Sequence, residues 1–269
     1  MPTAHNGATE IWYEAFGDGP PLVLVYGIGG NSRRWWRDFP GLLAERFRVI
    51  TLDNRGTGHS AQPREPWTMA DMVEDIRAVA DAEGLDALHL LGCSLGSLVA
   101  RHFGATYPGR LASLSLLCPP NGISATPEDM SLAILWDPKK ARIESERASW
   151  LVVHPESFIT AHEADLLADF ADAEAERTPA RTFRFQLDAA AAAPSPDPGV
   201  NAAHWPILLL HGTADRLVPP ENARSLHAAL PRSGLRWIEG ASHNFWQHEP
   251  EQAAGIVRDF LTRALEVTP

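Results

Sequence analysis

The sequence is poor in the features that mark several classes of protein. Its 269 residues include two cysteines, Cys93 and Cys118, too few for a disulfide framework or for a zinc site of four thiolates. No run approaches the 18 apolar residues that a membrane-spanning helix needs. The first ten residues, MPTAHNGATE, have no basic start and no apolar stretch, so we expect no signal peptide and a cytoplasmic protein.

Basic residues are also scarce. The chain has 23 Lys and Arg against 34 Asp and Glu, a formal charge of −11. Such an acidic surface opposes binding to nucleic acid, which needs clustered cations, and to anionic membranes. Hydrophobic residues make up 45% of the chain, which is ordinary for a globular protein. We therefore expect a folded monomer or homodimer whose partner is a small molecule.

Six short apolar runs stand out, and each leads into a glycine-rich or polar turn. They cover residues 21–27, 47–53, 88–94, 111–118, 207–212 and 235–240. Their length and branched aliphatic content are typical of strands buried on both faces. Helical patterns lie between several of them, as at 68–84, where Thr68 is a suitable N-cap and Gly84 a suitable end. This alternation predicts an α/β fold with a mostly parallel, doubly wound sheet.

The alternation breaks between residues 122 and 204, where the sequence is mostly helix-like. We interpret this segment as a helical cap inserted into a core domain made of residues 1–121 and 205–269. Ligands of open parallel sheets bind at the carboxyl ends of the strands. A cap at that edge would form one wall of a pocket.

The sharpest motif is Gly92-Cys93-Ser94-Leu95-Gly96, a G-x-S-x-G match between an apolar run and a helical pattern. A strand that turns abruptly into a helix forces the serine into an unusual backbone conformation, so small neighbours are needed. Ser94 would then be exposed above the sheet as a nucleophile. The alternative is a serine that only caps a helix.

A serine hydroxyl needs a base, and the base needs an orienting carboxylate. His243 lies in the loop 240–250, after the last apolar run, and Asp215 follows the run before it. With Ser94 they give the chain order serine, acid, histidine. The alternative role of Asp215 is to cap the next helix. Other histidines, including His102, His211 and His227, are expected to be packed or on the surface.

The first glycine-rich loop, VYGIGGNSRRWW (25–36), is a candidate for the oxyanion hole. A tetrahedral intermediate needs two donors, and we expect them to be the backbone N–H groups of Leu95 and Ile28. A phosphate cradle of the G-x-G-x-x-G type would need glycine at position 32, which is Ser32.

Together these motifs resemble the α/β-hydrolase superfamily, most closely the small bacterial esterases, enol-lactonases and cofactor-free haloperoxidase-like enzymes. The stretch 53–60 (DNRGTGHS) is similar to the family's D-x-R-G-x-G-x-S turn. The resemblance implies a nucleophile at Ser94, an acid at Asp215, a base at His243 and no metal or organic cofactor. One departure is Tyr26, which stands where the family usually has histidine.

Nine tryptophans are many for this length, and several fall near the expected pocket mouth. The residues predicted to bind substrate are Tyr26, Gly27, Trp35, Trp36, Trp136 and Trp246. Any one of them more often packs in a core, but together they favour an apolar or aromatic pocket. The sequence therefore predicts a serine hydrolase acting on a hydrophobic ester or lactone. Arg33 and Arg34 could meet a carboxylate, although solvent exposure is the default.

Two other hypotheses stay open at the level of sequence. The same three residues could serve a C–C bond hydrolase or a lyase with a different substrate pose. The scaffold could also carry a non-catalytic ligand receptor, because a fold alone does not fix function. An epoxide or haloalkane hydrolase is disfavoured, because such enzymes place aspartate where this chain has Ser94.

Overall fold

The computed structural model describes residues 2–36, 38–122, 142–175 and 178–267. Its eight strands form one sheet in the order β1-β2-β4-β3-β5-β6-β7-β8. The strands are β1 Thr3–Asn6, β2 Thr9–Phe16, β3 Pro21–Val25, β4 Arg48–Leu52, β5 Leu88–Cys93, β6 Leu111–Leu117, β7 Ile207–Gly212 and β8 Ser233–Ile238. From β4 to β8 every neighbouring pair is parallel. The predicted α/β sheet is confirmed, and all six predicted strands are present.

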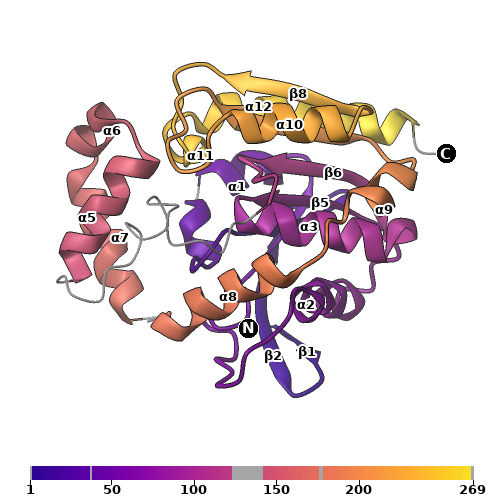
Figure 1. Ribbon diagram of the computed structural model, residues 1–269, viewed down its shortest axis with the longest axis horizontal. Coiled ribbons are helices and arrows are strands. Elements are labelled where there is room, and N and C mark those ends of the chain that lie inside the picture. Colours follow the sequence, from indigo (N-terminus) through magenta and orange to yellow (C-terminus); the bar gives the residue numbers. More distant parts are fainter. Residues whose placement is uncertain (1, 37, 123–141, 176–177, 268–269) are drawn as a thin grey trace.

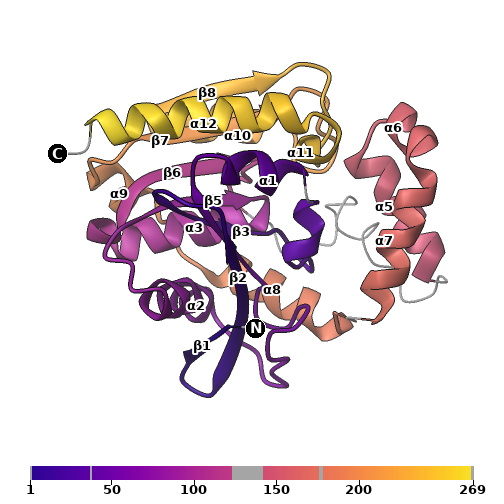
Figure 2. The ribbon, with the colours of Figure 1, turned by 180° about the vertical axis from the view of Figure 1, so that it is seen from behind.

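Helices cover both faces of the sheet (Figures 1 and 2). They are η1 Ser32–Trp35, α1 Asp38–Ala44, α2 Met69–Ala82, α3 Leu95–Thr106, η2 Pro108–Arg110, α5 Arg142–Val153, α6 Glu156–Ala161, α7 Glu163–Ala175, α8 Ala180–Ala192, α9 Asp197–Ala202, α10 Glu221–Ala229, α11 Phe245–His248 and α12 Pro250–Val267. Helices α2 and α3 cover one face, and α1 and α12 cover the other. In the described part of the chain, no helix is long and apolar enough to cross a membrane.

Strand β3 shows why the sheet is buried on both sides. Leu22 and Leu24 belong to the cluster under α1 and α12, whereas Val23 and Val25 belong to the cluster under α2 and α3. All four side chains are 0% exposed. Successive strand side chains point to opposite faces, so a central strand must be apolar throughout. This explains the continuous apolar runs in the sequence.

Helix α2 begins and ends where its sequence predicts. Thr68 and Asp71 form a reciprocal capping box, which satisfies backbone N–H groups in the first turn. Gly84 follows the helix with a φ of +66°, a conformation that glycine adopts without strain. These two signals set the limits of the helix that connects β4 to β5 in the sequence.

The first two strands were not predicted. Strands β1 and β2 form an antiparallel hairpin, with Asn6 opposite Thr9, and β2 pairs antiparallel with β4. Gly7 in the turn has a φ of +59°. The Asn6-Gly7 pair is the local signal that could have predicted this hairpin.

Between β6 and β7 the described chain is helical. Helices α5, α6 and α7, which we call the outer helices, stand beyond the carboxyl ends of the strands (Figure 1). Helix α8 then crosses back over the core, where Ala189 and Ala190 join the cluster that contains α2 and α3. The boundaries 122 and 204 of the expected cap stay a prediction, and residues 123–141 lie outside the described part.

Candidate active site

Ser94 sits at the turn between β5 and α3. It has φ 52° and ψ −124° and forms the N-cap of α3 without a side-chain capping bond. Such a backbone conformation is rare for a residue with a side chain. A Cβ added at Gly92 would lie 2.2 Å from the carbonyl oxygen of Gly96, and one at Gly96 would lie 2.2 Å from that of Val25. Both positions of the motif therefore require glycine, because any side chain there would overlap the backbone of a neighbouring segment.

Asp215 and His243 form a buried pair at the ends of β7 and β8. His243 Nδ1 lies 2.7 Å from Asp215 Oδ2. His243 is 3% exposed and Asp215 is 4% exposed. The other carboxylate oxygen accepts hydrogen bonds from the N–H groups of Leu217 and Val218, each at 2.9 Å. His211 Nε2 lies 3.2 Å from Asp215 Oδ2. Asp215 is thus held in place by its backbone and by two imidazoles.

The electrostatics keep this carboxylate ionised. Burial alone would raise the pKa of Asp215, but attraction to His243 and hydrogen bonding with His211 and His243 outweigh it and hold the pKa well below its usual range. An ionised carboxylate at Nδ1 orients the imidazole and favours its protonated form. The Nε2 atom is left to act on another group.

Cys118 lies beside that Nε2 atom. Its Sγ is 3.7 Å from His243 Nε2. Burial raises the pKa of the Cys118 thiol well above its usual range, and the backbone N–H of Ser94 acts on it in the opposite direction. The thiol therefore lies close to both the imidazole of His243 and the backbone N–H of Ser94.

Cys118, Asp215 and His243 also have the residue types of a metal site. Ligand atoms of Cys118, Asp215 and His243 lie within 4.8 Å of one another. Oδ2 of Asp215, however, already lies 2.7 Å from Nδ1 of His243. One oxygen of Asp215 is also occupied by backbone N–H groups. The donor set suits hydrogen bonding to the imidazole better than it suits a cation.

Ser94 and His243 border one cavity of about 140 Å³. The core contributes Tyr26, Gly27, Ile28, Gly29, Gly30, Arg34, Trp36, Cys93, Ser94, Leu217, His243, Asn244, Trp246 and Gln247 to the lining. The helices between β6 and β7 contribute Glu146, Ser149, Trp150, Val153, His154, Leu166, Asp169 and Phe183. The cavity thus lies between the carboxyl edge of the sheet and the outer helices.

The predicted substrate residues fall into three groups. Tyr26, Gly27, Trp36 and Trp246 line the cavity. Trp35 does not; it is 0% exposed, and its ring lies 5.1 Å from that of Tyr26 and 5.3 Å from that of Trp246. It therefore supports the lining from behind. Trp136 lies outside the described residues.

The candidate oxyanion donors come from two adjoining segments. Leu95 is the first residue of α3, so its N–H has no partner within the helix. Ile28 lies in the turn in which Gly30 N–H donates to Gly27 O at 3.4 Å. The neighbouring Gly29 N–H is used differently, because it donates to Gln186 Oε1 at 2.8 Å. Both assignments stay predictions, and the fold puts both N–H groups close to the elbow, because Gly27 approaches Ser94.

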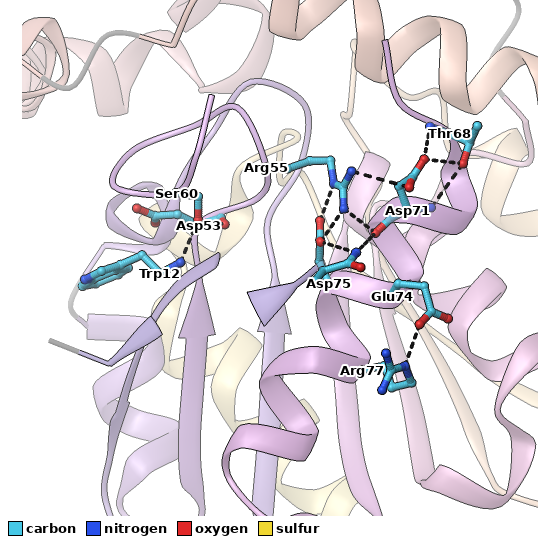
Figure 3. Close-up of polar contacts among 10 residues, drawn as sticks. Trp12, Asp53, Arg55, Ser60, Thr68, Asp71, Glu74, Asp75 and Arg77 are labelled. Atoms are coloured by element: carbon cyan, nitrogen blue, oxygen red, sulfur yellow. Dashed lines mark hydrogen bonds and ion pairs between the residues drawn. The ribbon is translucent and has the colours of Figure 1, made fainter. Parts of the chain in front are cut away.

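The D-x-R-G-x-G-x-S turn supports these loops rather than entering the cavity. Asp53 accepts hydrogen bonds from the N–H groups of Ser32 and His59, each at 2.8 Å, and so ties the first loop to β4. Arg55 makes a two-fold ion pair with Asp75 of α2, with distances of 2.5 and 2.6 Å (Figure 3). The turn thus connects the first loop, β4 and α2 outside the cavity, and we call it the brace.

The sequence did not reveal one group of cavity residues. Arg34 contacts Glu146 of α5 and Asp169 of α7, and all three line the cavity. The partners are 112 and 135 positions further along the chain. No local pattern connects them, so only the fold could place them together.

Comparison with known proteins identifies the family of the chain. Residues 20–248 match the model of the family described as the alpha/beta hydrolase fold. The chain is 31% identical, over 262 residues, to a protein of Variovorax paradoxus that is provisionally named carbamate hydrolase RutD; the match covers 94% of this chain and 96% of that one.

Solved structures share the whole architecture. The esterase RhEst1 from Rhodococcus sp. ECU1013 has a TM-score of 0.83 and 25% identity, with 97% of each chain covered. The enol-lactonase from Burkholderia xenovorans LB400 has a TM-score of 0.82 and 24% identity, with 97% of this chain and 100% of that one covered. The chain therefore belongs to the alpha/beta hydrolase family.

Proposed function

We propose that this protein is a serine hydrolase that cleaves a carboxylic ester or lactone of a small hydrophobic or aromatic molecule. The observation that carries the proposal is the strained Ser94, which borders the same cavity as His243, whose imidazole is paired with the buried Asp215. The relatives are named as an esterase, an enol-lactonase and a carbamate hydrolase. All three activities involve attack on an acyl carbon, which supports the proposal.

In this mechanism His243 Nε2 removes the proton of Ser94 Oγ as the oxygen bonds to the substrate carbonyl carbon. The N–H groups of Leu95 and Ile28 stabilise the oxyanion. When the intermediate collapses, His243 donates its proton to the departing alcohol oxygen, leaving an acyl-enzyme. His243 then activates a water molecule that releases the acid. Asp215 stays ionised throughout, because its pKa is held low.

The size of the cavity limits the substrate. At about 140 Å³ it resembles engineered cavities of about 150 Å³ that hold one benzene molecule. One aromatic ring, or a short acyl chain, therefore fits between the described residues. We propose that the outer helices act as the cap that encloses this group.

The test compares Ser94→Ala with the wild type in hydrolysis of phenyl acetate and in labelling by a fluorophosphonate. We expect kcat/KM to fall by roughly 10³-fold or more and labelling to disappear. Ser149→Ala and Cys93→Ala serve as matched controls, because each removes a rival nucleophile from the cavity lining; both should keep the label. Retention of turnover by Ser94→Ala, or a label on another residue, would contradict the proposal.

A further inference from the structure

A cation and two carboxylates meet in the wall of the cavity. Arg34 Nη1 lies 3.1 Å from Glu146 Oε1 and 2.9 Å from Asp169 Oδ2. The three side chains are 28%, 21% and 20% exposed, in the order Arg34, Glu146, Asp169. Glu146 Oε1 also accepts a hydrogen bond from Trp150 Nε1 at 3.2 Å. We call Arg34, Glu146 and Asp169 the charged triplet.

The charged triplet is fixed at its arginine end as well. The carbonyl oxygen of Arg34 accepts a hydrogen bond from Gln247 Nε2 at 2.8 Å, and Asn31 caps the short helix that carries Arg34. Burial alone would lower the pKa of Arg34, but Glu146 and Asp169 outweigh it and raise the pKa. The guanidinium is therefore charged and its charge is compensated by carboxylates of the chain itself.

Among the described residues that line the cavity, Arg34 is the only Lys or Arg. His154 also lines the cavity, and burial lowers its pKa to about 3, so it adds no positive charge at neutral pH. With both carboxylates ionised, the charged triplet carries one negative charge in excess. With either one protonated, the guanidinium is still neutralised.

From this arrangement we infer that Glu146 and Asp169 are specificity-determining residues that make the cavity select uncharged substrates and reject those that carry a carboxylate. A site that binds an anion offers it a cation with free hydrogen-bonding capacity. Here an anionic substrate group meets a like charge and no uncompensated cation. The inference rests on the proposed function and names the substrate class of the same site.

The test uses two aryl acetates of equal shape, 3-acetoxybenzamide, which is neutral, and 3-acetoxybenzoate, which is an anion. Each kcat/KM is divided by the rate constant for hydroxide-catalysed hydrolysis of the same ester, which removes the difference in leaving group. For the wild type we expect the neutral ester to be favoured by about tenfold or more, the size of one like-charge contact in a partly buried site. A ratio near one would overturn the inference and leave the proposed function intact.

The double variant Glu146→Gln, Asp169→Asn keeps the shape of the wall and leaves Arg34 uncompensated. We expect it to lower the preference for the neutral ester by about tenfold or more, or to reverse it. Asp172→Asn is the matched control: Asp172 is on the same helix as Asp169, is 70% exposed and pairs with Arg33 at 3.6 Å. It should keep the wild-type ratio. A folded double variant with an unchanged ratio would also overturn the inference.

A binding measurement tests the inference without the double variant, in case that variant does not fold. It also separates the inference from the proposed function. Calorimetry with Ser94→Ala protein compares 3-hydroxybenzamide with 3-hydroxybenzoate, which need no turnover. Tighter binding of the amide supports the inference, and equal or tighter binding of the carboxylate contradicts it. Failure of the wild type to hydrolyse either ester would instead count against the proposed function.

Discussion

The core and the outer helices are held by different forces. In the core, strands such as β3 are apolar on both faces and 0% exposed, and the turns are fixed by glycines in contact with backbone. The outer helices share a small apolar cluster with the core, made of Val152, Val153 and Leu217. Their other described contacts with the core are polar, as in the charged triplet, or between rings, as where the rings of Trp36 and Phe158 lie 5.6 Å apart. Burial of apolar surface is strong and insensitive to salt or pH, whereas exposed ion pairs are weak and sensitive to both.

The largest effect is expected at the elbow in the core. Gly96→Ala would put a Cβ 2.2 Å from the carbonyl oxygen of Val25, so backbone must move in the middle of the sheet. We expect the free energy of unfolding to fall by roughly 4 kcal/mol or more, measured by urea denaturation. Gly255→Ala in α12 is the opposite control, since its added Cβ meets nothing within 4 Å; it should stabilise the protein by about 0.5–1 kcal/mol. Equal effects of the two changes would undo the comparison.

The buried ion pair of the core comes next. Arg55 and Asp75 are 4% and 2% exposed, and Asp75 also accepts a hydrogen bond from Asn6 Nδ2 at 2.9 Å. Asp75→Asn removes the charge that compensates a buried guanidinium, and we expect a loss of about 3 kcal/mol. Thermal and urea denaturation would measure it. A loss below about 1 kcal/mol would mean that the brace in Figure 3 is not a stabilising feature.

Acid should weaken the contact between α5 and the core. Burial lowers the pKa of His154, at the end of α5, to about 3 and that of His248, in α11, to about 4, and their rings are 6.1 Å apart. Because both values lie below the unfolded value of about 6.5, their contribution is complete above pH 6.5 and is lost as pH falls towards 4. The pKa of Asp215 is also lower in the folded protein than in the unfolded chain. Its contribution to the free energy of unfolding is therefore lost only below about pH 4.

At pH 5 each buried histidine should cost roughly 1–2 kcal/mol. Hydrogen exchange at pH 7 and pH 5, corrected for intrinsic rates, should show protection lost in α5 and α6. Strand β5 should also respond, because burial lowers the pKa of His89 to about 4. His154→Gln should reduce this acid sensitivity. His162→Gln, at a ring that is 42% exposed, should not. An equal reduction of the acid response in β5 and in α5 of His154→Gln would contradict an effect local to α5.

The smallest effect is expected at a surface pair within the outer helices. Arg147 Nη1 lies 2.6 Å from Glu163 Oε1, and the side chains are 47% and 49% exposed. Glu163→Gln should change the free energy of unfolding by less than about 1 kcal/mol and should remove part of its salt dependence. A loss as large as that of Asp75→Asn would show that exposure does not separate the two regions.

The same division explains what the sequence could predict. The parallel strands were predictable because burial on both faces demands continuous apolar runs, and Ser94 was predictable because its turn demands Gly92 and Gly96. The β1–β2 hairpin was missed although Asn6-Gly7 indicates it. Its strands lie at the sheet edge, where burial on one side leaves a shorter apolar pattern.

The charged triplet could not be predicted. Arg34 follows a glycine-rich loop, and an arginine in that position is usually solvated. Its partners come from two helices that are distant in sequence, and their charges are ordinary for helix surfaces. Only a structure shows that these surfaces face inward at the cavity. The residues that we infer to set the selectivity of the site therefore lie in the outer helices, where the sequence pattern predicts least.

One backbone hydrogen bond connects the two regions at the catalytic loop. The N–H of Asn244, directly after His243, donates to the carbonyl oxygen of Val153 at 3.0 Å. Val153 is the last residue of α5, so any departure of α5 from the sheet breaks this bond and frees the peptide next to the imidazole. Any movement of α5 that opened the cavity would therefore also release the loop that carries the proposed general base.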